Sequence, residues 1–171
     1  IAYCTNEGIL AGTGNGKFNP TGELTGLEFA KMLLVALGYD ASIAHLTGSA
    51  WAINTSKLAL GDADLDNGME SVALSATLTR EQAAQMAFNA MQATLVEYED
   101  TGSNIVLPGD IVINTNPSKA TPVTSKVKAE ATNISDEKTT DGQWTVEFAE
   151  KYCKDLKLTS SDADTSASWI R

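Results

Sequence analysis

Two short segments share one helix-start pattern, and this pattern constrains the fold more than any other feature of the sequence. The first reads Leu-Thr-Gly-Leu-Glu over residues 24–28, and the second reads Leu-Thr-Arg-Glu-Gln over residues 78–82. In each segment the threonine can cap the third helical amide while the side chain three residues later reaches back, which is a capping box. The sequence therefore predicts helices that begin at Gly26 and Arg80.

Apolar residues follow both helix starts. Residues 29–37 leave little polar face, so we predict a helix that is buried on most sides and ends at Gly38, where glycine can adopt the left-handed conformation. In residues 80–95, alanine and methionine recur at positions that they also hold in the first copy. Core packing explains this recurrence more simply than a cofactor groove. The residues that we predict to be buried are Phe29, Leu33, Met86 and Phe88.

Two copies of one plan at a fixed offset indicate a repeat architecture. Residues 8–34, GILAGTGNGKFNPTGELTGLEFAKMLL, resemble the second half of an S-layer homology repeat. The sequence SAWAINTSKLALG at residues 49–61, followed by LTREQAAQM at residues 78–86, is similar to another such repeat. The resemblance extends over roughly the first 95 residues.

The resemblance implies a mainly α-helical protein, a pseudo-repeat bundle of helix-loop-helix units with a small β or irregular insertion. We expect two repeats in residues 1–97, the first of them truncated at its front. Residues 98–143 form the insertion, because short β-branched runs alternate there with proline and glycine turns. Residues 144–171 are expected to supply an amphipathic helix that packs back as a third unit, followed by a tail.

Bacterial proteins with such repeats are typically anchored to a cell-wall polysaccharide. The resemblance thus implies an extracellular, non-catalytic anchoring module that binds an acidic secondary cell-wall polysaccharide. It implies glycan contacts at Arg80, Thr79, Glu81 and Trp51, although packing is the simpler role for the tryptophan. The first copy has Gly26 in place of the arginine. The alternative is a structural surface-layer scaffold that binds other copies of itself or another protein without recognising sugar.

Net charge argues against several classes of partner. The chain has 12 Lys and Arg residues against 22 Asp and Glu residues, which gives a net charge of -10. Such a field repels nucleic acid and anionic membrane surfaces. No apolar run approaches the roughly 20 residues that a membrane-spanning helix needs. We therefore expect no nucleic-acid partner and no membrane span.

The common catalytic patterns are missing. The one histidine, His45, gives little basis for a Ser-His-Asp arrangement, and the sequence contains no GxSxG or HExxH motif. The glycine-rich residues 12–17 do not follow a convincing strand, so a turn explains them better than a phosphate loop does. We therefore expect that the chain is not an enzyme.

Alternating aspartates at Asp62, Asp64 and Asp66 resemble a calcium loop, because calcium takes several oxygen ligands from one short turn. The register departs from that of an EF-hand, since Gly68 falls one place late. We therefore expect a solvated acidic turn and no cofactor, with a weak calcium site as the alternative.

The two cysteines, Cys4 and Cys153, lie in similar local sequences near opposite ends of the chain. Two alternatives remain open at this point, namely small buried residues on related helices or a disulfide.

Overall fold

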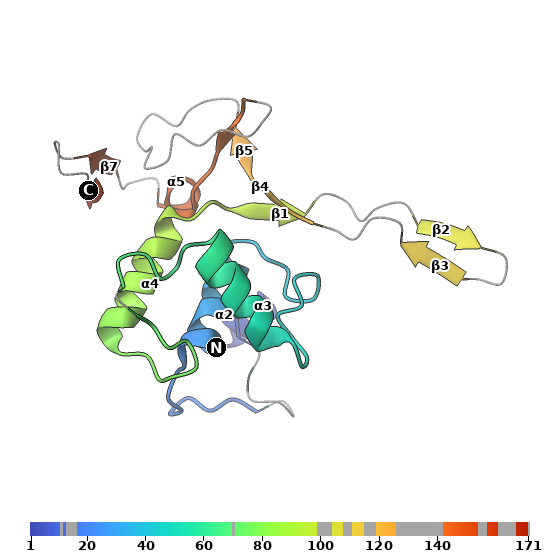
Figure 1. The fold of residues 1–171 in the computed structure, drawn as a ribbon, viewed down its shortest axis with the longest axis horizontal. Coiled ribbons are helices and arrows are strands. Elements are labelled where there is room, and N and C mark those ends of the chain that lie inside the picture. The colour runs from blue at the N-terminus through green and yellow to red at the C-terminus, as the bar shows by residue number, and fades with distance from the viewer. Residues whose placement is uncertain are drawn as a thin grey trace.

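Figure 1 shows the fold as a computed structural model. The structure describes residues 1–10, 12, 17–69, 71–98, 104–107, 111–114, 119–125, 142–153, 157–160 and 167–170. The predicted turn at residues 13–16 and much of the predicted insertion, including residues 126–141, lie outside these ranges.

The described residues form short helices and short strands. The helices are α1 (Ala2–Asn6), α2 (Gly26–Ala36), α3 (Trp51–Lys57), α4 (Arg80–Gln92) and α5 (Phe148–Tyr152), and the π-helical segment η1 (Leu58–Asp62) continues α3. The strands form antiparallel pairs, which are β1 (Val96–Tyr98) with β4 (Ala120–Pro122), β2 (Asn104–Leu107) with β3 (Ile111–Asn114), β5 (Thr124–Ser125) with β6 (Trp144–Thr145), and β7 (Lys157–Ser160) with β8 (Ala167–Ile170).

The expectation of a mainly α-helical bundle is wrong, because the described chain is a mixture of helices and two-stranded β pairs. Helices α2, α3 and α4 lie together, and the strands that follow α4 extend to one side of them (Figure 1). The chain leaves α4 in an extended conformation. The amide of Val96 then donates to the carbonyl of Leu37 at 2.9 Å, which fastens β1 to the end of α2.

The C-terminal helix is also shorter than predicted. Trp144 and Thr145 form β6, which pairs with β5, so they are not helical. Helix α5 begins only at Phe148, directly after a turn in which the amide of Glu147 donates to the side chain of Glu150 at 2.8 Å. The β-branched residues before Glu147 explain the difference, since they suit a pleated strand better than a helix.

Both predicted capping boxes are confirmed. The Thr25 hydroxyl accepts from the Glu28 amide at 3.3 Å, and the Glu28 carboxylate accepts from the Thr25 amide at 2.9 Å. Thr79 and Gln82 form the same pair of hydrogen bonds at 3.1 and 3.0 Å. Helices α2 and α4 therefore begin at the predicted residues.

The predicted end of α2 is also confirmed. Gly38 has a φ of 105°, a region that side chains rarely adopt. The amide of Gly38 donates to the carbonyl of Val35 at 3.1 Å, and that of Tyr39 donates to the carbonyl of Leu34 at 3.0 Å. This pair of bonds is a Schellman motif. A Cβ atom at Gly38 would also collide with the carbonyl oxygen of Val96, so helix end and strand start meet at a point where only glycine fits.

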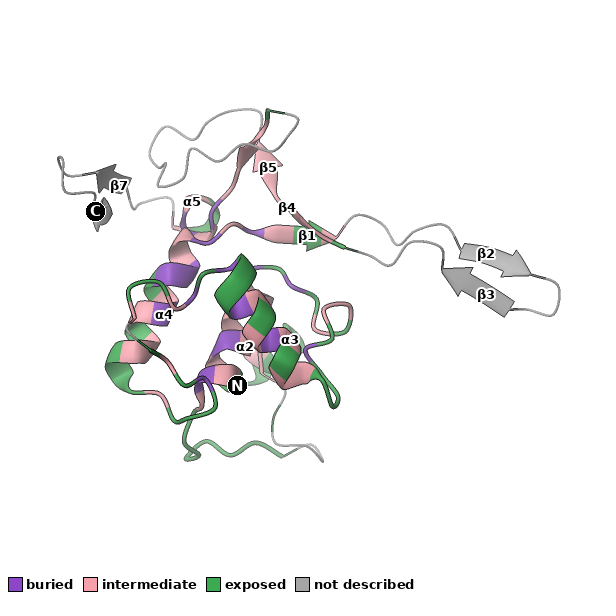
Figure 2. Cartoon of the chain, viewed as in Figure 1, coloured by how far each residue is buried: buried purple, intermediate pink, exposed green. Residues whose placement is uncertain are grey.

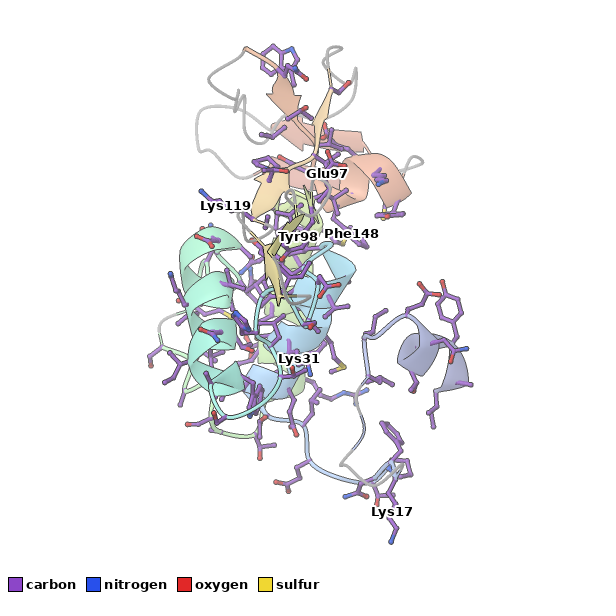
Figure 3. All side chains as sticks on the ribbon, turned by 90° about the vertical axis from the view of Figure 1, so that its right-hand side faces the viewer. Lys17, Lys31, Glu97, Tyr98, Lys119 and Phe148 are labelled. Carbon is purple, nitrogen blue, oxygen red and sulfur yellow. The ribbon has the colours of Figure 1, made fainter. Side chains whose placement is uncertain are left out.

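Helix α1 stands apart from the other helices. It buries none of its residues, and Ile1 and Tyr3 are largely exposed. Figure 3 shows α1 separate from the other helices, and Figure 2 shows buried residues on α2 and α4. The hydrophobic core of the described chain is thus built without α1.

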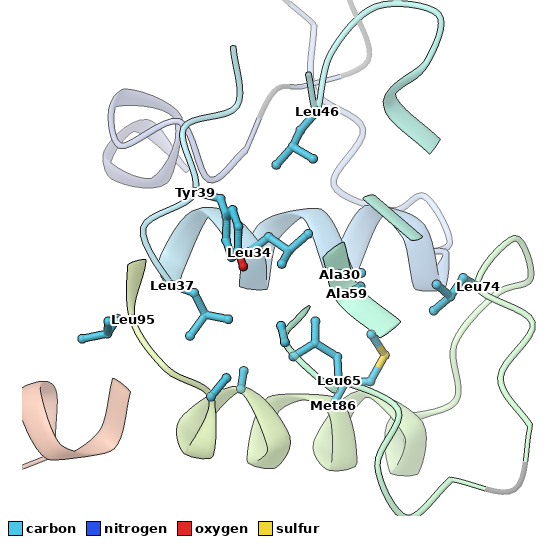
Figure 4. Close-up of a cluster of buried hydrophobic side chains, with 13 residues drawn as sticks. Ala30, Leu34, Leu37, Tyr39, Leu46, Ala59, Leu65, Leu74, Met86 and Leu95 are labelled. Carbon is cyan, nitrogen blue, oxygen red and sulfur yellow. The ribbon is translucent and has the colours of Figure 1, made fainter. Parts of the chain in front are cut away.

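The core lies between α2 and α4 (Figure 4). Met86 is buried, as predicted, and Phe29 and Leu33 are half-buried against the core. Phe88 is 36% exposed, so its predicted burial is wrong. Met86, Asn89 and Ala90 form the face of α4 that packs on the core. Phe88 lies two positions after Met86, so its side chain points to the opposite side of the helix. The other buried hydrophobic residues are Ala30, Leu34, Leu37, Tyr39, Leu46, Ala59, Ala63, Leu65, Leu74, Ala93, Leu95 and Ala149.

Candidate functional site

The starts of the two capped helices are joined by backbone hydrogen bonds. Residues 74–78 run antiparallel to residues 24–27, and the amide of Leu78 donates to the carbonyl of Leu24 at 2.9 Å. The Thr77 hydroxyl also donates to the Glu23 carboxylate at 2.9 Å. The two copies of the helix-start pattern therefore form one continuous surface.

In the first copy this arrangement closes the N-terminus of α2. The amide of Gly26 donates to the carbonyl of Ala76 at 3.0 Å, and the amide of Leu27 donates to that of Leu74 at 2.7 Å. The Glu28 amide is occupied by the Thr25 cap. The free amides that make a helix N-terminus attractive to anions are therefore already used in α2.

In the second copy the N-terminus of α4 is open. Within the described residues, the backbone amides of Arg80 and Glu81 have no acceptor, and their side chains form no ion pair or hydrogen bond. Both side chains are exposed. The Thr79 hydroxyl accepts from the Gln82 amide, so its first role is to cap the helix. This end of α4 offers unpaired donors, the positive end of a helix dipole and a guanidinium group in one place.

Trp51 lies in a groove of about 630 Å³, which we call the Trp51 groove. Phe18 and Lys31 also line this groove, and burial lowers the pKa of the Lys31 ammonium group from its ordinary value. The carboxylates of Glu23 and Glu28 line it as well, but each is held by a threonine, Glu23 by Thr77 and Glu28 by its capping box. The groove thus combines two aromatic side chains with a lysine that has no ion-pair partner in the described part of the chain.

The predicted glycan contacts fall at two neighbouring places. Arg80 does not line the Trp51 groove, so the structure does not put Arg80 and Trp51 in one pocket. Leu24 does line it, and the carbonyl of Leu24 accepts from Leu78, the residue before the Thr79 cap. The groove and the open end of α4 are therefore connected across the backbone bridge.

The turn that carries Asp62, Asp64 and Asp66 is fixed by hydrogen bonds from the side chain of Asn89. The Asn89 side-chain amide donates to the carbonyls of Leu65 and Asn67, both at 2.9 Å, and its oxygen accepts from the Gln85 side chain at 2.9 Å. Two carbonyls that could otherwise face a cation are therefore occupied.

The aspartates of this turn do not form a metal cluster. Asp62 and Asp64 are exposed and Asp66 is partly exposed, and the described residues contain no group of three acidic, histidine or cysteine side chains that could hold a metal ion. Cys4 and Cys153 are free thiols, and both are partly exposed, so neither is the buried core residue that we considered.

Sequence reasoning missed two features of this surface. One is the closure of α2 by residues 74–76, and the signal for it was the glycine at position 26, where the second copy has arginine. The other is Lys31, whose place beside Trp51 depends on how the helices pack and leaves no local pattern in the sequence.

The family model for the S-layer homology domain matches residues 1–30. Residues 1–30 are therefore similar to an S-layer homology domain. Searches of curated proteins and of solved structures found no significant match. The matched segment covers α1, the glycine-rich sequence at residues 12–17 and the first residues of α2, and the second copy lies beyond it.

S-layer homology domains are non-catalytic modules that anchor proteins at the bacterial cell wall or cell surface. The resemblance inferred from the residues is thus confirmed, and so is the predicted location at the bacterial cell surface. In the part of the chain that the structure describes, no helix is both long and apolar enough to cross a membrane.

Proposed function

We propose that this chain attaches its protein to the bacterial cell surface by binding an acidic secondary cell-wall polysaccharide at the open N-terminus of α4. The observation that carries this proposal is the contrast between the two helix starts. Among the residues that the structure describes, the amides of Arg80 and Glu81 have no acceptor, whereas those of Gly26 and Leu27 are occupied by backbone carbonyls. An acidic sugar can therefore use the second start and not the first.

Three interactions favour an anion at this place. The free amides donate hydrogen bonds, the helix dipole presents its positive end, and the Arg80 guanidinium can bind a carboxylate through two parallel hydrogen bonds. The molecule as a whole carries a charge of -10, so a local positive site is needed to hold an anionic polymer against long-range repulsion. Glu81 would accept hydrogen bonds from sugar hydroxyl groups.

The Trp51 groove would bind further sugar units of the same polysaccharide chain. A chain of sugars that leaves Arg80 reaches the groove across the bridge between Leu78 and Leu24. There it meets the apolar faces of Phe18 and Trp51 and the Lys31 ammonium group. Sugar rings pack well on aromatic side chains, which present a large apolar surface with a polar edge.

Binding to purified cell-wall sacculi tests the proposal. We expect Arg80→Ala to weaken binding at least tenfold, about 1.4 kcal/mol. Its effect on the unfolding free energy should be small, because Arg80 is exposed and forms no side-chain bond with any described residue. Arg80→Lys should recover part of the loss, since lysine keeps the charge without the two-pronged geometry. Lys151→Ala is the matched control, because it removes one exposed cation from α5.

Two results would contradict the proposal. The first is full-strength binding by Arg80→Ala, and the second is equal binding to sacculi stripped of their secondary polymers. Absence of sacculus binding by the unmutated chain, together with concentration-dependent self-association, would favour the scaffold function.

A further inference from the structure

A second groove lies where the helices meet the first strands, and no role has been assigned to it. It has a volume of about 570 Å³, a size typical of small-molecule sites. We call it the Tyr39 groove. Tyr39, Lys57 and Asp62 line it from the helical side, and Tyr98 and Lys119 line it from the strands. Figure 3 shows Tyr98 and Lys119 at this end of the helices and Lys31 farther down. The Trp51 groove shares none of these residues.

The charged side chains that line the Tyr39 groove are mainly basic, whereas the protein as a whole has a net charge of -10. Lys57 and Lys119 are both exposed, and neither ammonium group has a carboxylate within 4.0 Å in the described chain. Asp62 is the one acidic residue among the residues that line the groove. The nearby Asp40 carboxylate accepts from the amides of Ser42 and Ile43 at 2.8 and 2.9 Å, so it is occupied in its own turn.

The walls of the groove offer rings and hydroxyl groups together. Tyr39 is only 6% exposed, yet within the described residues its hydroxyl has no hydrogen-bond partner. Thr94 adds a further hydroxyl group, and the Asn54 side chain, whose amide nitrogen donates to the carbonyl of His45 at 3.1 Å, adds an amide oxygen. A ligand with many hydroxyl groups and an apolar ring face matches this lining better than a purely aromatic anion does.

The local backbone gives an independent reason to suspect a binding site. Leu58 and Asp62, the first and last residues of η1, both line the groove. A π-helical turn is less favourable than an α-helical one, and such turns occur frequently at functional sites. Here η1 carries the acidic side chain of the groove.

We propose that the Tyr39 groove binds an acidic sugar, with its ring against Tyr39 and Tyr98 and its carboxylate between the Lys57 and Lys119 ammonium groups. The choice of a sugar rests on the proposed function of the chain, whereas the choice of an anion rests on Lys57 and Lys119, which have no carboxylate partner among the described residues. This site lies at the C-terminal end of α2, and the Arg80 site lies beside its N-terminal end.

Titration of the full chain with glucuronate, followed by NMR shifts of the Tyr39, Tyr98 and Lys57 signals, tests the proposal. Glucose has the same ring without the carboxylate and should bind at least tenfold more weakly. The Lys57→Met, Lys119→Met double variant should lose at least tenfold in glucuronate affinity. Lys151→Met, which removes a lysine outside both grooves, should keep the affinity of the unmutated chain.

A charge-neutralising variant gives the sharpest result. Asp62→Asn should tighten glucuronate binding about two- to tenfold, because it removes the one acid that repels the ligand. A folding defect would instead weaken binding, so this gain cannot arise from damage to the structure. Tighter binding by Asp62→Asn would therefore support the proposal strongly.

Several outcomes would overturn the proposal. These are no shift of the Tyr39 groove signals with glucuronate, equal binding of glucose, or no effect of the double lysine variant. Inorganic phosphate that binds as tightly as glucuronate would overturn the sugar assignment. Glucuronate binding that persists in Arg80→Ala, while that variant loses sacculus binding, would show that the two sites act separately.

Discussion

The backbone of Gly26 packs directly against that of Leu74. A Cβ atom at position 26 would lie 2.8 Å from the Leu74 Cα and 2.9 Å from the Leu74 carbonyl oxygen. Both of these atoms belong to the backbone, so they cannot turn aside as a flexible side chain would. The position that holds arginine in the second copy is thus restricted to glycine in the first, and the same contact closes the N-terminus of α2.

We expect Gly26→Ala to lower the free energy of unfolding by about 1 to 3 kcal/mol, because the added methyl group forces two backbone segments apart. Gly61→Ala is the matched control, since nothing lies within 4 Å of a Cβ atom there. Urea unfolding measures both variants. A Gly26→Ala protein as stable as the Gly61→Ala protein would show that residues 74–76 do not pack on α2.

Leu34 should contribute more to stability than its neighbour Leu33. Leu34 is fully buried, whereas Leu33 is only partly buried against the core. Leu34→Ala is expected to cost about 2 to 5 kcal/mol as a core cavity, and Leu33→Ala should cost clearly less. Chemical unfolding of the two variants tests the order, and a larger loss for Leu33→Ala would contradict the packing of α2 described above.

Asn89 should stabilise the acidic turn. Its replacement by alanine leaves the carbonyls of Leu65 and Asn67 without their donor, and we expect a loss of about 1 to 3 kcal/mol. Gln92→Ala is a suitable control, because Gln92 lies one turn later and its side chain forms no hydrogen bond within the described structure. Similar stabilities for the two variants would rule out this role for Asn89.

Calcium should have little effect on the melting temperature. Asn89 already occupies two carbonyls of the acidic turn, and Asp62 lines the Tyr39 groove. A ligand that binds only the native state raises the melting temperature through linkage. Thermal unfolding in excess chelator and in millimolar calcium provides the test, and a calcium-dependent rise of many degrees would restore the calcium site that the aspartate pattern suggested.

Alkaline pH should destabilise the protein through Tyr39. Burial first, and then the nearby Asp62 carboxylate and Tyr98, together raise the pKa of Tyr39 from 10.0 to about 12. The unfolded chain therefore loses the tyrosine proton at lower pH than the native chain does, so stability falls as pH rises from about 10 through about 12. Urea unfolding across this range should show a weaker pH dependence for Tyr39→Phe, and an unchanged dependence would contradict the assignment. Burial also raises the pKa of Tyr98, so part of the dependence should remain.

Local patterns predicted the parts of this fold that local interactions determine. The capping boxes at Thr25 and Thr79 and the glycine end of α2 each depend on residues a few positions apart, and all three are present. The burial of Phe88 was predicted wrongly because hydrophobicity alone does not say which side of α4 faces the core. The C-terminal helix was predicted too long, since the pairing of β6 with β5 is a tertiary contact that competes with helix formation.

The candidate site divides in the same way. Arg80 was found from the sequence because it belongs to a short motif at a helix start. The occupation of the Gly26 amide by Ala76, and the meeting of Lys57 with Lys119 in one groove, both depend on residues brought together by folding. Both contacts join residues far apart in the sequence, so no local sequence motif predicts either of them.

The bridge between the two helix starts also sets an order of events during synthesis. Glu23 and Thr77 lie 54 residues apart in the sequence, yet their side chains are hydrogen-bonded in the native protein. While the ribosome is still adding residues before Leu74, the native acceptors of the Gly26 and Leu27 amides, which are the carbonyls of Ala76 and Leu74, do not yet exist. Contacts across such a long loop form late and slowly. The first copy can therefore complete its native hydrogen bonds only after the second copy has been synthesised. A secretion machinery that received this chain during translation would bind a partly folded domain.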